Sequence, residues 1–90
     1  MDFELNTAKD AINRIKHGYP LALGRIILEN VVADVLDPRE YLTEFGPEER
    51  RLAYGLVAGR LFVCVYTIRD GTCRLISVRK ANMREQRKWL

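Results

Sequence analysis

The feature that most constrains this sequence is the dipeptide Asp70-Gly71, which lies between two runs rich in β-branched residues. A two-residue type I′ turn needs positive φ at both central positions, and Asp-Gly adopts it readily. The dipeptide therefore predicts an antiparallel hairpin of strands 61–68 and 72–80. Ala58-Gly59 is a weaker turn of the same length. It adds a strand over 50–57 and makes a three-stranded meander.

The Asp-Gly turn also predicts the pairing register, and with it the two faces of the meander. It places Phe62 opposite Arg79 and Val63 opposite Val78. One face is then an apolar surface with a polar row at one end, formed by Leu52, Tyr54, Val63, Val65, Ile76 and Val78 with Arg50, Thr67 and Arg74. The other face is mixed, so either a helix or a ligand is expected against it; it holds Arg51, Ala53, Gly55, Phe62, Cys64, Tyr66, Leu75, Ser77 and Arg79. The same register keeps Cys64 and Cys73 too far apart for a disulfide.

Shorter signals predict the elements around the meander. Residues 3–5 and 31–36 indicate two further strands, and 39–49 indicate a loop. A helix is expected from its cap at Thr7 to Gly18, with one apolar stripe formed by Ala8, Ala11, Ile12 and Ile15. A second helix starts at Pro20, and a third covers 81–90 with Asn82 and Glu85 as a capping pair. The expected fold is one α+β domain over 1–90: an antiparallel sheet of three C-terminal strands plus one or two N-terminal strands, with two N-terminal helices and one C-terminal helix.

Charge is divided unevenly along the chain. Residues 1–45 hold 5 Lys/Arg and 8 Asp/Glu, whereas residues 46–90 hold 10 and 4, a net +6. A basic half indicates a polyanion or an acidic protein as partner, and a solvated surface explains it equally well. No apolar run reaches the ~20 residues of a membrane span, and the N-terminus lacks a secretion signal. No zinc-ligand pattern or phosphate-binding glycine loop occurs. We therefore expect a cytoplasmic protein without metal, cofactor or membrane contact.

The segment 74–80 carries most of the residues suited to chemistry on phosphates. It brings Arg74, Ser77 and Arg79 onto a rigid strand that continues into a basic helix. RNA cleavage by the 2′-hydroxyl needs a base, an acid and cations that stabilise the phosphorane, but no metal. The sequence offers cations for this in Arg50, Arg74, Arg79 and Lys80, and groups for proton transfer in Tyr66 or His17.

Each of these residues also has a purely structural interpretation. The arginines fit the solvated side of a sheet. His17 lies in Lys16-His17-Gly18 at a helix end, where it can bond the last carbonyl groups. Trp89 fits an anchor of the last helix better than a base-stacking platform.

The order of several short motifs resembles the BrnT-type toxins of bacterial type II toxin–antitoxin systems. The matching pieces, in chain order, are Lys9, Asn13 and Lys16-His17-Gly18, then Glu48-Glu49-Arg50, Ala53-Tyr54-Gly55, Gly59-Arg60, Val63-Cys64-Val65-Tyr66-Thr67 with Arg69, Arg74-Leu75-Ile76-Ser77-Val78-Arg79-Lys80-Ala81, and Glu85 with Trp89. The sequence departs from the family pattern at Leu5-Asn6, Leu21 and Val78, where packing and capping are affected more than polar chemistry.

The resemblance implies a RelE-like fold and a ribonuclease that arrests translation. It also implies a cognate antitoxin, expected to be a dimeric DNA-binding protein of the ribbon-helix-helix type that forms a heteromeric complex with the toxin. Catalysis is expected from Arg50, Tyr66, Arg74, Ser77, Arg79 and Lys80, with His17 as a further candidate, and RNA binding from Arg60, Arg69, Arg84, Arg87 and Lys88. The alternative is a non-catalytic basic module that acts only through a protein or nucleic-acid partner.

Overall fold

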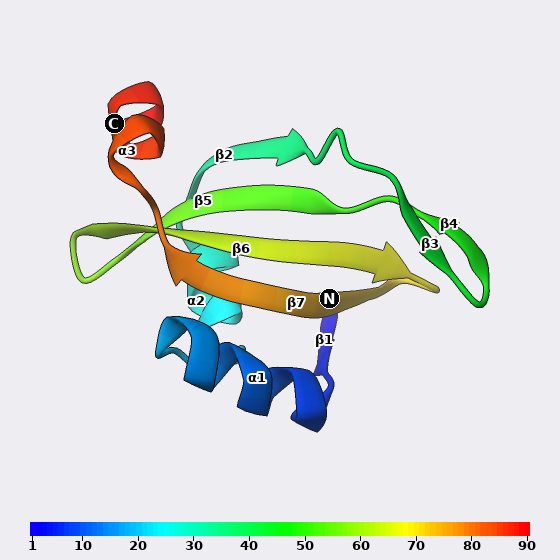
Figure 1. Ribbon diagram of the computed structural model, residues 1–90. Coiled ribbons are helices and arrows are strands. Elements are labelled where there is room, and N and C mark those ends of the chain that lie inside the picture. Colours follow the sequence, from blue (N-terminus) through cyan, green and yellow to red (C-terminus); the bar gives the residue numbers. More distant parts are fainter.

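A mixed five-stranded sheet is the centre of the computed structural model, which describes residues 1–90 (Figure 1). In chain order the elements are β1 (Asp2–Leu5), α1 (Thr7–His17), α2 (Leu23–Glu29), β2 (Val31–Leu36), β3 (Tyr41–Thr43), β4 (Gly46–Glu48), β5 (Arg51–Val57), β6 (Arg60–Arg69), β7 (Thr72–Lys80) and α3 (Met83–Trp89). The strand order is β1-β7-β6-β5-β2, with β1 parallel to β7 and every other pair antiparallel. The predicted α+β class is confirmed.

Apolar residues pack on both faces of the sheet, but unequally. The larger core lies under α2, which passes behind β6 and β7 in Figure 1, and its buried residues are Leu21, Ile27, Ala53, Phe62, Cys64, Tyr66, Cys73, Leu75 and Val78. A smaller core on the opposite face comprises Tyr54, Leu61, Val63 and Ala81, with Trp89 of α3 packed against it. The α3 helix covers only one end of this second face, so the rest of it stays open.

The predicted register holds near the Asp-Gly turn and fails beyond it. Thr67 pairs with Arg74 and Tyr66 with Leu75, as expected, but a β-bulge then makes Ser77 the partner of Val65. Ile76 is the extra residue. Because side chains alternate between faces, one inserted residue moves everything after it to the other face.

Two corrections follow from the bulge. Arg79 pairs with Val63 and lies on the open face, not opposite Phe62 as predicted. Val78, expected on the apolar surface with Val63, instead joins the larger core beneath the helices. The mixed face of the prediction is thus the main core, and a helix, not a ligand, covers it.

The α1 helix turns its polar side to the protein. The predicted apolar stripe faces solvent, since Ile12 is 61% exposed and Ile15 is 88% exposed. Asn13, by contrast, is only 3% exposed. The Asn13 side chain donates hydrogen bonds to the carbonyl groups of Tyr19 and Val78 and accepts one from the Val78 N–H. It thereby completes the edge of β7 beyond Leu75, where the partner strand β1 ends.

Other boundaries differ by a few residues. The N-cap of α1 is Asn6, whose side chain accepts from the N–H groups of Ala8 and Lys9; Thr7 was predicted. The α2 helix begins at Leu23, three residues after Pro20, and the predicted loop over 39–49 contains the β3–β4 hairpin. The capping box of α3 is confirmed. None of the three helices has the length and apolar character needed to cross a membrane.

Candidate active site on the open face of the sheet

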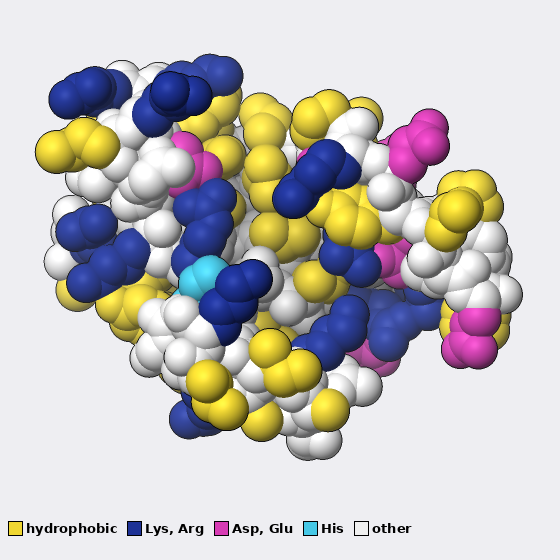
Figure 2. Space-filling model, viewed as in Figure 1, with side chains coloured by type: hydrophobic (Ala, Val, Ile, Leu, Met, Phe, Trp, Pro, Cys, Tyr) yellow, Lys and Arg dark blue, Asp and Glu magenta, His cyan; other side chains and the backbone are white.

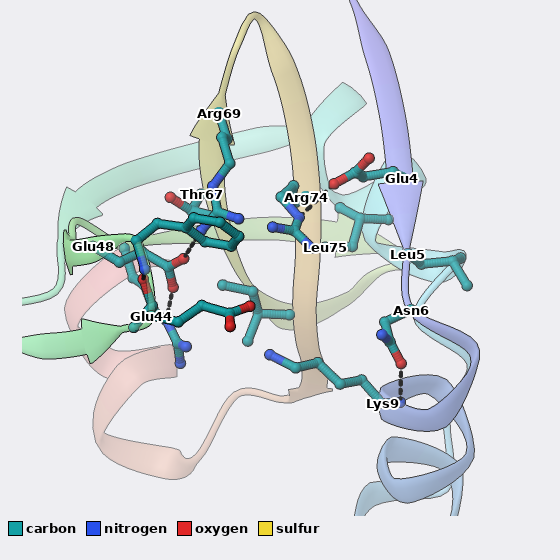
Figure 3. A pocket seen from close by; sticks show the side chains of 14 residues that line it. Glu4, Leu5, Asn6, Lys9, Glu44, Glu48, Thr67, Arg69, Arg74 and Leu75 are labelled. Carbon is teal, nitrogen blue, oxygen red and sulfur yellow. Dashed lines mark hydrogen bonds and ion pairs between the residues drawn. The ribbon is translucent and has the colours of Figure 1, made fainter.

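A hollow of about 390 Å³ opens on the sheet face that α3 leaves uncovered (Figure 3). It lies between α1, the ends of β6 and β7, and the β3–β4 hairpin. The residues lining it are Glu4, Leu5, Asn6, Lys9, Thr43, Glu44, Phe45, Glu48, Arg50, Thr67, Arg69, Arg74, Leu75 and Ile76. Figure 3 shows Lys9 extending into the hollow from one side and Glu44 from the other. The hollow therefore collects charged side chains from segments far apart in the sequence.

Glu48 organises the arginines at the hairpin end of this hollow. Its carboxylate accepts from Arg50 Nε at 2.8 Å and from Arg69 Nη2 at 2.7 Å. Burial opposes ionisation of Glu48, but the hydrogen bond from Arg50 and the charges of Arg50, Arg69 and Lys9 hold its pKa below the usual range. Thr67 lies beneath them, bonded to the Glu49 carbonyl. The carboxylate fixes two guanidinium groups side by side.

An aromatic ring supports Arg50 from the other side. The Arg50 guanidinium carbon lies 3.9 Å from the centre of the Tyr41 ring, in the range of a cation–π contact. The Tyr41 hydroxyl donates to the buried carboxylate of Asp37, which Arg39 also holds through hydrogen bonds. The hydrogen bond from the Arg39 side chain is the main reason that the Asp37 pKa falls to about 2. Tyr41 and Arg50 are thus held in fixed positions.

The far wall of the hollow provides two further cations. Arg74 on β7 forms an ion pair with Glu4 on β1. Lys9 on α1 forms no ion pair within the chain. Since an unpaired ammonium can bind a ligand anion without first giving up a partner, Lys9 is the most available cation of the hollow.

A second hollow of about 230 Å³ adjoins the first and shares Lys9 and Ile76 with it. Its other lining residues are Ile12, Asn13, Lys16, His17 and Ser77. Desolvation, together with the charges of Lys16 and Arg79, lowers the pKa of His17 below 6.5. Figure 2 shows this histidine, in cyan, flanked by dark blue Lys and Arg side chains. The imidazole is therefore neutral at pH 7 and able to accept a proton. We call the two hollows together the cationic groove.

Arg79 lies at the α3 end of the groove and is held by Glu85. Two hydrogen bonds of 2.7 and 2.9 Å join the guanidinium to the carboxylate. Glu85 also accepts from the Tyr54 hydroxyl and from the Asn82 backbone N–H. These bonds, that of Arg79 above all, lower the pKa of Glu85 to about 2. The docking of α3 on the sheet thus fixes the position of Arg79.

The groove contains some of the residues predicted for the site and not others. The structure brings five of the predicted catalytic residues and one predicted RNA-binding residue to the open face: His17, Arg50, Arg74, Ser77, Arg79 and Arg69. The helical residues Arg84, Arg87 and Lys88 lie on α3, beyond the end of the groove, and Arg60 bonds the Ala81 carbonyl near the β5–β6 turn.

Tyr66 and Lys80 lie away from the groove. Tyr66 belongs to the larger core on the opposite face, where its hydroxyl donates to Asp34, and desolvation raises its pKa to about 12. Lys80 follows Arg79 in the strand, so it points the other way, and its ammonium lies over the Tyr19 ring. Neither side chain lines either hollow.

Sequence reasoning gave no site role to four groups in or beside the groove, namely Lys9, Glu48, Tyr41 and Phe45, although Lys9 and Glu48 belong to the motifs that resemble the family. Lys9 had a signal, because Lys9, Asn13 and Lys16 follow each other at spacings of four and three, which places them near one side of a helix. The other three lie on the β3–β4 hairpin, which was predicted to be a loop. No local pattern indicated that this hairpin meets the sheet beside Arg69.

The protein is thus a small α+β domain with one sheet face covered by helices and a cationic groove on the other. A family model described as "Ribonuclease toxin, BrnT, of type II toxin-antitoxin system" matches residues 6–85. The chain therefore belongs to the BrnT family of ribonuclease toxins, and the resemblance seen in its motifs is confirmed. No curated protein sequence matches the chain.

Proposed function

We propose that this chain cleaves RNA in the cationic groove without a metal ion. The 2′-hydroxyl of the substrate attacks the adjacent phosphorus, the bond to the 5′-oxygen breaks, and the products are a 2′,3′-cyclic phosphate and a 5′-hydroxyl. The observation that carries the proposal is the convergence on one open face of an imidazole and a set of cations, namely His17 with Lys9, Lys16, Arg50, Arg74 and Arg79.

His17 is the general base of this proposal. Its lowered pKa keeps the imidazole neutral at pH 7, so that it can take the proton of the 2′-hydroxyl. Since only the neutral form accepts a proton, the cleavage rate should rise with pH through the His17 pKa, with its midpoint below pH 6.5. The leaving 5′-oxygen takes its proton from an ammonium group of the groove, Lys9 or Lys16, or from water.

The guanidinium groups stabilise the phosphorane. Arg74 lines the first hollow and Arg79 lies close enough to His17 to lower its pKa, so phosphate between them would be flanked by cations on both sides. Removing one such electrostatic contact typically costs about 10²–10³ in rate. Each guanidinium is held by a carboxylate, which keeps it in place before RNA binds.

Cleavage of a mixed-sequence RNA in excess EDTA tests the mechanism. The parent should generate cyclic-phosphate ends, and His17→Ala should lose about 10²–10⁴ in rate. Lys80→Ala is the matched control, because Lys80 lies on the opposite face, and it should cleave as the parent does. Activity that EDTA abolishes and a divalent metal restores contradicts the mechanism. A folded chain that binds RNA but never cleaves it supports a non-catalytic binding module.

The consequence in the cell that we propose is arrest of translation in the cytoplasm, through loss of RNA. Induction of the chain alone should stop incorporation of labelled amino acid within minutes, and co-expression of the antitoxin should prevent this. Induction of His17→Ala at equal protein level should leave incorporation unchanged. Arrest by that variant would separate toxicity from RNA cleavage.

We further propose that the antitoxin is a dimeric DNA-binding protein of the ribbon-helix-helix type, with an acidic segment that crosses the basic α3 end of the groove. Opposite charge favours this contact and speeds association. Arg84→Glu with Arg87→Glu should weaken the toxin–antitoxin complex, whereas Arg25→Glu, on α2, should not. Unchanged affinity of the double variant would show that the antitoxin binds elsewhere.

A further inference from the structure

The β3–β4 hairpin presents an aromatic ring that the fold does not use. Phe45 is 77% exposed and belongs to neither core. Nevertheless its backbone is held: Thr43 Oγ1 accepts from the Phe45 N–H at 3.1 Å and donates to the Gly46 carbonyl at 2.9 Å. Gly46 adopts φ +102°, a conformation that favours glycine. The turn therefore fixes the backbone from which the ring projects.

Phe45 lies at the wall of the cationic groove. It lines the 390 Å³ hollow together with Arg50, Arg69 and Arg74, and also a smaller hollow of about 160 Å³ next to it. The Arg69 guanidinium carbon lies 5.2 Å from the centre of the Phe45 ring, and Glu48 holds the same guanidinium. An exposed ring beside several cations, one of which contacts it directly, is the combination that binds single-stranded nucleic acid by stacking and charge together.

We propose that Phe45 is the stacking surface for a nucleobase next to the phosphate bound in the cationic groove, with Arg69 as its partner in that subsite. This inference rests on the proposed function, since it assigns a base-binding position to the same RNA site. Stacking tolerates every base because each has a π-face, and the larger purines stack over more area. The subsite therefore favours a purine modestly over a pyrimidine.

The surroundings of Phe45 fit a nucleobase better than a protein partner. Leu42, a second exposed apolar residue of the hairpin at 84%, lines a different hollow, with Leu36 and Pro38. The exposed Pro47 lines both that hollow and the 160 Å³ hollow of Phe45. Phe45 and Leu42 therefore line no common hollow. Pro47 and Ile68 are the apolar side chains that share the 160 Å³ hollow with Phe45, whereas the cations Arg50, Arg69 and Arg74 share the 390 Å³ hollow with it. A ring that faces these cations fits a nucleobase next to a phosphate.

Binding of non-cleavable RNA separates this subsite from catalysis. The probes are fluorescent 2′-O-methyl oligomers of eight nucleotides: oligoadenylate, oligouridylate and an abasic sugar-phosphate chain of equal length. The 2′-O-methyl group removes the nucleophile, so affinity is measured without cleavage. The proteins are the parent, Phe45→Ala, Phe45→Trp and the control Leu42→Ala.

Loss of one stacked base predicts that Phe45→Ala weakens oligoadenylate binding about 5- to 150-fold. Phe45→Trp and Leu42→Ala should both bind oligoadenylate as tightly as the parent does. All four proteins should bind the abasic chain with the same affinity. Equal affinity of the parent and Phe45→Ala for oligoadenylate overturns the proposal. So does an equal loss on the abasic chain, failure of the parent to bind oligoadenylate, or a Phe45→Ala variant that loses only its antitoxin. If the parent stacks the oligomer but cleaves no RNA, the proposed function fails while this subsite stands.

Discussion

Glu85→Gln should remove a stabilising charge whose contribution depends on pH in a defined way. The folded-state pKa of about 2 lies about 2.5 below the ordinary 4.5. At about 1.4 kcal/mol per pKa unit, this corresponds to about 3 kcal/mol in the free energy of unfolding. Glu85 is 13% exposed and Arg79 31%, so solvent screens the pair somewhat, and we expect a loss of about 2–3 kcal/mol at pH 7.

The pH dependence has a fixed sign. A carboxyl group whose pKa is lowered on folding stabilises the protein above its unfolded pKa of about 4.5, and that contribution is lost as the pH falls toward 2. The stability gap between the parent and Glu85→Gln should therefore shrink to about half or less at pH 3. Asp37, whose pKa is also about 2, acts equally in both proteins and cancels in the difference.

Urea unfolding at pH 7, 4 and 3, followed by circular dichroism, measures this gap. Fluorescence of Trp89, the single tryptophan, follows the α3 end, because its ring lies 5.5 Å from that of Tyr54. Glu44→Gln serves as the control, since Glu44 is exposed and forms no ion pair, and it should change stability by less than about 0.5 kcal/mol. A gap of the same size at pH 7 and pH 3 would refute the reasoning, because the lost stability would not come from the ionised carboxylate.

Three further changes test other parts of the structure. Asn13→Ala removes three hydrogen bonds to backbone groups and should lower the free energy of unfolding by about 3 kcal/mol or more. The melting temperature in a thermal scan should then fall by more than about 10 °C. A shift of only a few degrees would contradict the role of Asn13 at the edge of β7. Gly55→Ala should destabilise by about 3 kcal/mol in urea, because its Cβ would lie 2.3 Å from the Ile27 carbonyl oxygen, whereas Gly59→Ala meets no atom and should cost only about 1 kcal/mol. Arg79→Lys should keep an ion pair with Glu85 and melt within a few degrees of the parent, yet lose about 10²–10³ in RNA cleavage rate, because an ammonium lacks the planar fork of a guanidinium; full activity would make Arg79 a structural residue.

The meander could be predicted because its signals are local. Asp70 and Gly71 both adopt positive φ in the structure, and so do Ala58 and Gly59. The bulge at Ile76 could not be predicted, because nothing in the residues 74–80 marks where an extra residue enters a strand. The error in the register then placed Arg79 and Val78 on the wrong faces, and with them one side of the candidate site.

The predicted orientation of α1 was wrong for a different physical reason. The apolar stripe of α1 predicted that this side of the helix is buried. In the structure, the three hydrogen bonds of the buried Asn13 amide contribute more to the stability than burial of Ile12 and Ile15 would, and both isoleucines stay exposed. Helical spacing alone does not show that β1 pairs with β7 only as far as Leu75 and leaves an edge of β7 for Asn13 to complete. The β3–β4 hairpin was missed because each of its strands has only three residues, too few for alternation to be recognised.

The way in which α1 is held on the sheet determines how often the cationic groove is complete. A helix that buries few apolar side chains and depends on a small number of hydrogen bonds opens locally at a much lower free energy than the sheet beneath it. In this protein that helix carries Lys9, Lys16 and His17. Its amide protons should therefore exchange with solvent well before those of β6, and each opening removes the proposed general base while Arg50 and Arg69 remain in place. Under the proposed mechanism, the closing of α1, and not the global stability of the fold, then sets the fraction of molecules able to cleave RNA.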